Sequence, residues 1–168
     1  MRLSACCLLS ATLVFGFAFQ SARAEDKMVY AGRATSKFVN FPGLPKCMTG
    51  SVQNGDPSKG ASVILAKSTA GCTVPWHWHT ADEQLMFVSG TAKISMKEGQ
   101  PTSVRSGDYL SLPGKNPHQF TCIAACTLFI SPSGAFDIHY VDKDGKEISP
   151  EEALKSGAKK PMKKGMKM

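Results

Sequence analysis

Short apolar segments separated by turn residues run through most of this 168-residue chain, and their spacing most strongly constrains its fold. Strict alternation is clearest at 91–97, where Ala92, Ile94 and Met96 share one face and polar residues occupy the other. Turn residues recur roughly every 8–12 positions, which predicts an all-β sandwich or barrel. Further strands are expected at 37–41 (strand or arm), 47–53, 61–67, 85–88 (ending at Ser89-Gly90), 102–105, 109–112, 127–130 and 138–141.

The first 24 residues differ from the rest of the chain. Arg2 precedes the apolar run 8–19, and Ala22-Arg-Ala24 provides small residues at a cleavage position before Glu25. This pattern is typical of a secretory signal peptide, with an uncleaved anchor as the alternative. No later apolar run is long enough to cross a bilayer. We therefore expect a periplasmic or secreted protein without stable membrane insertion.

The formal net charge of +7 comes mainly from the two ends of the chain. Six of the 20 basic residues lie in 155–168 and two in 1–24, which leaves a nearly neutral central part. No basic helix or basic–aromatic surface is apparent, so no nucleic-acid partner is expected. The predicted organisation is a signal peptide at 1–24, an N-terminal arm and strands at 25–54, a β-barrel at 55–148, and a short helix with a disordered Lys/Met-rich tail at 149–168.

Four cysteines follow the predicted cleavage site. An even number in an exported protein favours disulfides, and four cysteines allow three pairings. Cys122 and Cys126 are close enough in sequence to close a tight hairpin, which would leave Cys47 to pair with Cys72. Buried free thiols are the alternative.

Two histidines lie one residue apart in a Trp-rich, strand-like segment. Alternation places His77 and His79 on one face and Trp76 and Trp78 on the other. Glu83 follows after a short polar turn. Imidazole and carboxylate groups on one face are ligands for a divalent transition metal.

The same residues belong to a longer spaced pattern. It reads Gly71-x5-His77-x-His79-x3-Glu83-x6-Gly90, followed by Gly107-x5-Pro113-x4-His118. This pattern resembles the two-part signature of the cupin superfamily, and the chain is similar to small, exported single-domain cupins. The resemblance implies a jelly-roll β-barrel with a metal in its mouth, bound by His77, His79, Glu83 and His118.

Two positions depart from the family pattern. Lys115 stands where the second motif has glycine, and Cys122 stands where asparagine is common. Neither is a ligand position, so they bear on loop geometry and on the surroundings of the site. His139 is either a fifth ligand or a strand histidine that faces solvent or a neighbouring side chain.

The implied ligand set suits one ion of Fe, Mn, Ni, Cu, Co or Zn. Histidines that only form hydrogen bonds, or a site that stays empty, are the alternatives. No cationic side chain is expected to point at the metal, which favours a neutral or aromatic small molecule.

Two functions follow from this reading. One is a metal-dependent enzyme, a dioxygenase or an isomerase. The other is a non-catalytic metal- or ligand-binding sensor of the cell envelope. A homodimer formed through the arm at 25–41 is also expected.

Overall fold

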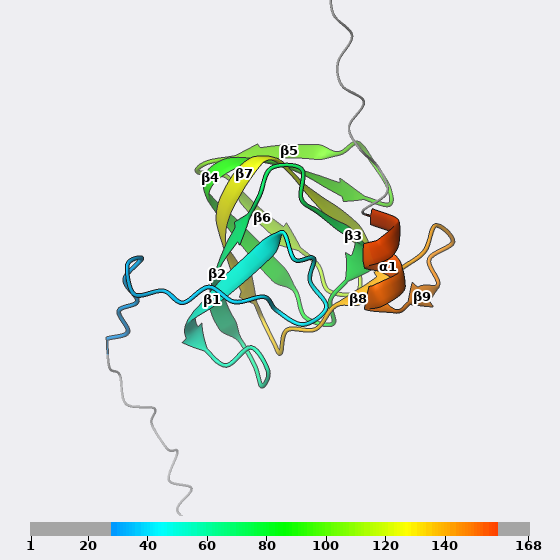
Figure 1. The fold of residues 1–168 in the computed structure, drawn as a ribbon. Coiled ribbons are helices and arrows are strands. Elements are labelled where there is room, and N and C mark those ends of the chain that lie inside the picture. The colour runs from blue at the N-terminus through cyan, green and yellow to red at the C-terminus, as the bar shows by residue number, and fades with distance from the viewer. Residues whose placement is uncertain (1–27, 158–168) are drawn as a thin grey trace, which may run out of the picture.

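The computed structural model describes residues 28–157, and these form an antiparallel β-structure with one helix (Figure 1). The predicted signal peptide at 1–24 and the tail after Gly157 lie outside the described residues. The strands form one curled nine-stranded sheet, so the predicted all-β jelly roll is confirmed. The elements are β1 Met48–Gly55, β2 Ser62–Ser68, β3 Thr73–Trp78, β4 Glu83–Met96, β5 Thr102–Arg105, β6 Tyr109–Leu112, β7 His118–Pro132, β8 His139–Val141, β9 Glu147–Ile148 and α1 Pro150–Gly157.

Two long strands, β4 and β7, connect the two halves of the sheet. They pair with each other over most of their length. The first part of β7 also pairs with β3, and its last part pairs with β2. Both β5 and β6 add to β4. Because β4 and β7 are antiparallel, the start of β4 pairs with the end of β7. The curl of the sheet, and not this pairing, brings the starts of β4 and β7 and the end of β3 around one cavity.

Two strand boundaries predicted from the sequence were wrong. Gly90 does not end a strand, because β4 continues through it with a positive φ of 89°. The segment 127–130 is the second half of β7 and not a separate strand. Irregularities in the β4–β7 register between Phe87 and Ala92 allow both strands to bend and continue, as β-bulges do.

Both proposed cysteine pairs are at bonding distance. The sulfur atoms are 2.09 Å apart in Cys47–Cys72 and 2.16 Å apart in Cys122–Cys126. The expected hairpin at Cys122–Cys126 is wrong, because both residues lie within β7 and span its bulged part. The Cys122 N–H donates to the Cys72 carbonyl at 2.8 Å, so the two disulfides adjoin across β3 and β7.

The core lies between the inner faces of the sheet. Ala92 and Ile94 point inward as predicted, as do Leu85, Phe87 and Phe120. Apolar side chains removed from water in this way provide the main driving force for the fold.

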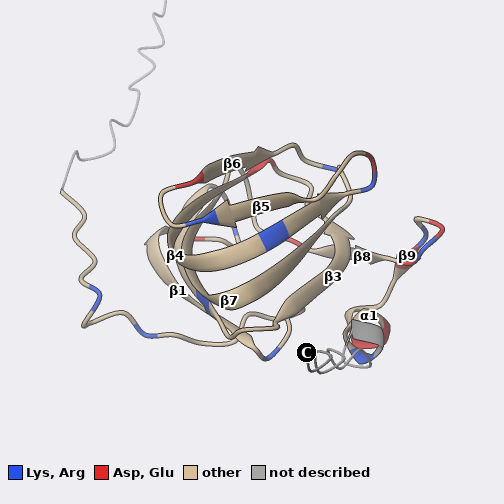
Figure 2. Ribbon diagram, turned by 90° about the horizontal axis from the view of Figure 1, so that it is seen from above, with Lys and Arg blue, Asp and Glu red and all other residues tan. Residues whose placement is uncertain are grey.

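The two ends of the described chain pack differently. Ser149 caps α1, with its Oγ accepting the Glu152 N–H at 3.2 Å, and Ala153 is buried in the core. The predicted strand at 37–41 is reduced to one bridge, between Val39 and Gly50. Acidic and basic residues are interspersed over strands and loops (Figure 2). Among the described residues, no helix is long and apolar enough to span a membrane.

Gly90 is predicted to be essential to the β4–β7 pairing. A Cβ atom there would lie 2.2 Å from the Ala125 carbonyl oxygen, and the φ of 89° adds backbone strain. Gly90→Ala should lower the free energy of unfolding by about 3 kcal/mol or more. Gly99 is the matched control, because its φ is 92° and no atom lies within 4 Å of its Cβ position. Gly99→Ala should cost only about 1 kcal/mol in urea denaturation. Equal losses in the two variants would contradict this account.

Candidate metal centre

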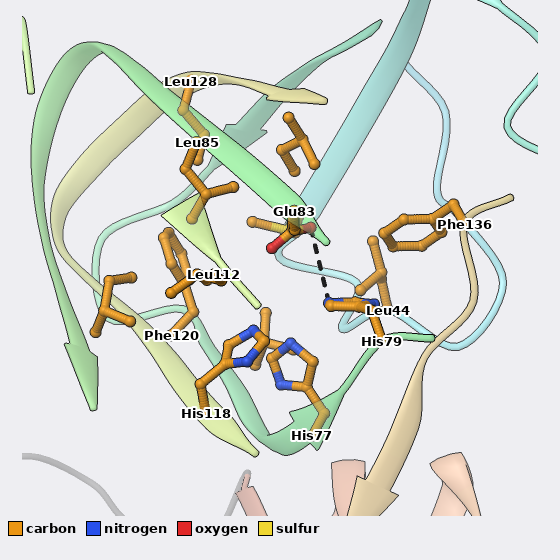
Figure 3. A pocket seen from close by; sticks show the side chains of 14 residues that line it. Leu44, His77, His79, Glu83, Leu85, Leu112, His118, Phe120, Leu128 and Phe136 are labelled. Carbon is orange, nitrogen blue, oxygen red and sulfur yellow. Dashed lines mark ion pairs between the residues drawn. The ribbon is translucent and has the colours of Figure 1, made fainter. Parts of the chain in front are cut away.

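Four polar side chains meet where β3 ends and where β4 and β7 begin (Figure 3). His77 lies in β3 and pairs in register with His118, the first residue of β7. His79 follows directly after β3, and Glu83 is the first residue of β4. All four are buried. The sheet topology therefore brings together all the residues that the spacing singled out.

The three imidazoles form a compact cluster. One ring nitrogen from each of His77, His79 and His118 lies within 4.8 Å of the others. The ring centroids of His77 and His118 are 4.3 Å apart. Glu83 lies beside the cluster, with Oε1 3.7 Å from Nε2 of His79.

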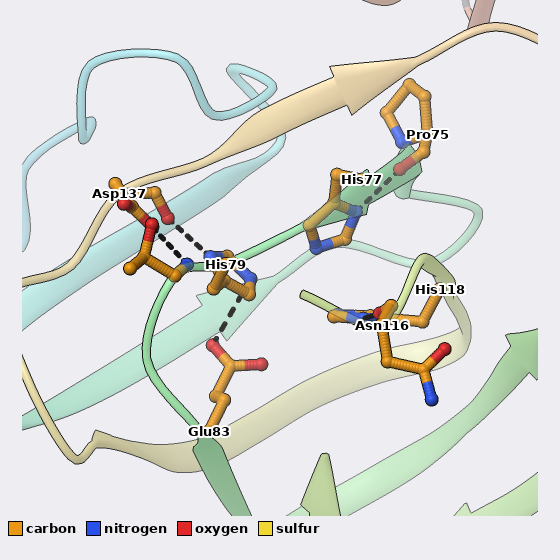
Figure 4. Close-up of polar contacts among 8 residues, drawn as sticks. Pro75, His77, His79, Glu83, Asn116, His118 and Asp137 are labelled. Atoms are coloured by element: carbon orange, nitrogen blue, oxygen red, sulfur yellow. Dashed lines mark hydrogen bonds and ion pairs between the residues drawn. The ribbon is translucent and has the colours of Figure 1, made fainter. Parts of the chain in front are cut away.

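Each imidazole bonds through Nδ1 to a backbone carbonyl oxygen (Figure 4). The pairs are His77 with Pro75 at 2.6 Å, His79 with Asp137, and His118 with Asn116 at 3.0 Å. Because a carbonyl oxygen only accepts, Nδ1 carries the hydrogen in each neutral ring. The tautomer then leaves the Nε2 lone pair available for coordination, which is how metal-ligating histidines are usually oriented.

Burial sets the charge state of the cluster. Desolvation lowers the pKa of His77, His79 and His118 below the ordinary value. Desolvation also raises the pKa of Glu83 to about 7, although the neighbouring His118 favours the carboxylate. The imidazoles are therefore neutral, which is the form that binds metals.

This donor set fits a divalent transition metal. Three neutral imidazoles with fixed tautomers could hold such an ion, and a carboxyl group adjoins them. The cavity beside them is almost entirely apolar and has a volume of about 30 Å³. Among the described residues, no lysine or arginine lines this cavity.

Comparison with protein families agrees with this architecture. A family model described as the cupin domain matches residues 65–131, which include the three clustered histidines and Glu83. The chain belongs to the cupin superfamily. No curated protein matches the sequence of this cupin.

Solved structures support the cupin fold at low sequence identity. The polyketide cyclase RemF from Streptomyces resistomycificus has a TM-score of 0.59 and 16% identity, covering 71% of this chain and 90% of that one. An acetylacetone dioxygenase from Acinetobacter johnsonii has a TM-score of 0.56 and 15% identity, covering 81% and 93%. An RmlC-like cupin from Shewanella frigidimarina has a TM-score of 0.55 and 14% identity, covering 65% and 93%. At such identities the likeness concerns the fold alone.

The loop before β7 explains one departure from the cupin pattern. Lys115, at the usual glycine position, has a φ of 59°, and among the described residues it is the one non-glycine with positive φ. Its N–H donates to the His79 carbonyl at 2.7 Å. Gly114 packs so closely that an added Cβ would lie 2.6 Å from the Thr80 carbonyl oxygen. The strained loop is therefore held directly against the segment that carries His79.

Sequence reasoning missed several residues that shape the site. The backbone carbonyl of Asp137 accepts a hydrogen bond from Nδ1–H of His79. The Asp137 carboxylate accepts a second hydrogen bond, from the Thr80 N–H at 2.8 Å. Asp82 accepts from the Gly114 N–H at 2.8 Å. Neither aspartate lies at a position of the spaced histidine and glutamate pattern. No local sequence signal therefore distinguishes these two residues from acidic residues on the surface.

His139 is not part of the cluster. Its ring stacks on Trp78, with centroids 3.9 Å apart, and its nitrogens face Asp137 and Glu147. Of the two alternatives for His139, the structure shows the strand histidine that packs against its neighbours.

The three clustered histidines are predicted to control metal occupancy. His77→Ala, His79→Ala and His118→Ala should each lower metal affinity by at least about 100-fold, because each removes a nitrogen donor. His139→Ala is the matched control and should retain full occupancy. Metal content measured by mass spectrometry after dialysis tests this, with circular dichroism to confirm folding. Unchanged occupancy in all three variants would contradict the site.

Glu83 is predicted to make the stability of the metal-free protein depend on pH. Its pKa is about 7 when folded, against an ordinary value of 4.5, so the folded state binds the proton more tightly. The resulting contribution to the free energy of unfolding is fully present below pH 4.5 and is lost as the pH rises through about 7. Between about pH 5 and about pH 8, the free energy of unfolding of wild type should fall by up to about 3 kcal/mol relative to that of Glu83→Gln.

Urea denaturation after chelator treatment measures this difference. The three histidines are present in both proteins, so the difference reports on Glu83 together with its effect on His118. A constant difference between the two proteins across this range would show that Glu83 titrates normally.

Proposed function

We propose that this cupin is an exported, mononuclear metal-dependent oxidoreductase of the dioxygenase type that acts on a small neutral substrate. The observation that carries the proposal is the set of three imidazoles whose Nδ1–H groups bond to backbone carbonyls, with Glu83 beside them. An acetylacetone dioxygenase has the same fold, which is compatible with this activity.

The proposed ligands are His77, His79, Glu83 and His118, holding one ion of Fe, Mn, Ni, Cu, Co or Zn. When bound, such an ion supplies Lewis-acid chemistry and, for redox-active metals, reaction with dioxygen. The backbone carbonyls keep the imidazoles oriented without any movement during the reaction. Among the described residues, Glu83 is the one carboxyl group that lines the cavity, so a detached Glu83 is the group that would accept and return a proton, at Oε1.

The cavity favours a neutral and very small reactant. Its lining is apolar apart from the four polar side chains, so a charged substrate would find no partner there. A volume of about 30 Å³ is space for about two water-sized groups. Dioxygen fits this space, whereas the aromatic substrate considered from the sequence needs a wider cavity.

The second candidate is a non-catalytic metal- or small-molecule-binding sensor. It is favoured by the lining of the cavity, in which the described part of the chain places no acid–base group besides the four polar residues. An isomerase is less favoured for the same reason, because proton transfer between two substrate positions commonly uses a separate acid and base.

Export is part of the proposal and rests on two features. The first is the signal-like segment at 1–24. The second is the pair of disulfides, which are typical of oxidising compartments. A periplasmic or secreted location follows from them, and the homodimer stays a prediction.

Oxygen consumption by the metal-loaded protein tests the enzymatic proposal. The purified protein should contain about one metal ion per chain and consume oxygen with a neutral substrate of two or three heavy atoms. His118→Ala should reduce the rate by at least about 100-fold, whereas His139→Ala should not. Tightly bound zinc with no turnover on any substrate would instead support the sensor.

A further inference from the structure

The lining of the cavity beside the histidines is buried except at two residues. The cavity is lined by 14 residues, and all of them are buried except Leu44 and Phe136, which are half-buried. Figure 3 places both side chains on the His79 side of the cavity. These two residues are the part of the lining that solvent reaches most easily, and we call them the entrance pair.

The Phe136 ring is held over a metal-binding histidine. Its centroid lies 5.2 Å from that of His79. On its other side it meets Phe41 edge-on, with centroids 6.3 Å apart. The Phe136 N–H donates to the Pro57 carbonyl at 2.7 Å, which fixes the backbone that carries the ring.

Leu44 belongs to a segment that is tied down on both sides. The Tyr140 hydroxyl donates to the Gly43 carbonyl at 2.7 Å, and the Leu44 N–H donates to the Phe41 carbonyl at 3.2 Å. Three residues further on, Cys47 is bonded to Cys72. Leu44 is thus a fixed wall, and the bulk of the Phe136 ring decides how wide the entrance is.

We infer that Phe136 is the size-selecting residue of this cupin and, with Leu44, limits the ligands that reach the metal to those of two or three heavy atoms. This inference rests on the proposed metal site and adds the size of its ligand. The cavity is small, with a volume of about 30 Å³, so a linear triatomic ligand fits it better than a five-membered ring does. Neither residue is a ligand or a proton carrier, so the selection is steric.

Visible absorption of the cobalt(II)-loaded protein provides a test that does not depend on turnover. Azide and tetrazolate are both nitrogen donors of charge −1, but tetrazolate is a five-membered ring. In wild type, azide should shift the cobalt spectrum at concentrations at least about tenfold lower than tetrazolate. Phe136→Ala should strengthen tetrazolate binding by about tenfold or more and leave azide binding within about twofold.

Two further variants keep the test decisive. Phe41→Ala is the matched control, because Phe41 is half-buried and touches Phe136 but does not line the cavity. It should retain wild-type selectivity. Phe136→Leu keeps an apolar side chain of smaller volume and should give an intermediate gain, which covers the case in which Phe136→Ala does not fold.

Cobalt uptake, measured first, separates the two ways in which the inference fails. If wild type takes up about one cobalt ion but Phe136→Ala and Phe136→Leu select like wild type, the entrance pair does not select by size. The same conclusion follows if Phe41→Ala relaxes selectivity equally. If wild type binds no cobalt, the metal site fails and the inference fails with it.

Discussion

The burial of three imidazoles and a carboxyl group at one end of an apolar barrel is the constraint on which the rest of the site depends. Charged groups are costly in such surroundings, so burial lowers the pKa of the histidines and raises that of Glu83 to about 7. Neutral rings in turn require their N–H groups to be bonded. The carbonyls of Pro75, Asp137 and Asn116 meet that requirement and thereby fix which nitrogen faces the cavity.

The long strands make this arrangement available. His77 and His118 are register partners because β3 and β7 pair at that point, and Glu83 starts the strand that runs alongside β7. The bulges between Phe87 and Ala92 let β4 bend without ending. If Gly90 carried a side chain, it would collide with the Ala125 carbonyl, and the pairing that places Glu83 would be disturbed.

The fold class and the four polar residues of the site could be predicted from the sequence, because alternation and motif spacing are local signals. The sequence predicted the cysteine pairs from compartment and proximity but misjudged their setting, because a bulge within β7 leaves no turn signature. It placed a strand end at Gly90, since glycine marks turns and bulges alike. Leu44, Phe136 and Asp137 were not identified, because their roles come from contacts between distant segments.

The entrance and the ligands are linked through adjacent residues. Phe136 restricts access, and Asp137, the next residue, accepts the hydrogen bond that orients His79. The Asp137 carboxylate also bonds the Thr80 N–H, one residue after His79. A movement of this backbone large enough to widen the entrance would therefore disturb the orientation of His79, one of the proposed metal ligands. Larger molecules are thus excluded by the Phe136 ring itself. They are also excluded because displacing the backbone that carries this ring would disturb the orientation of His79.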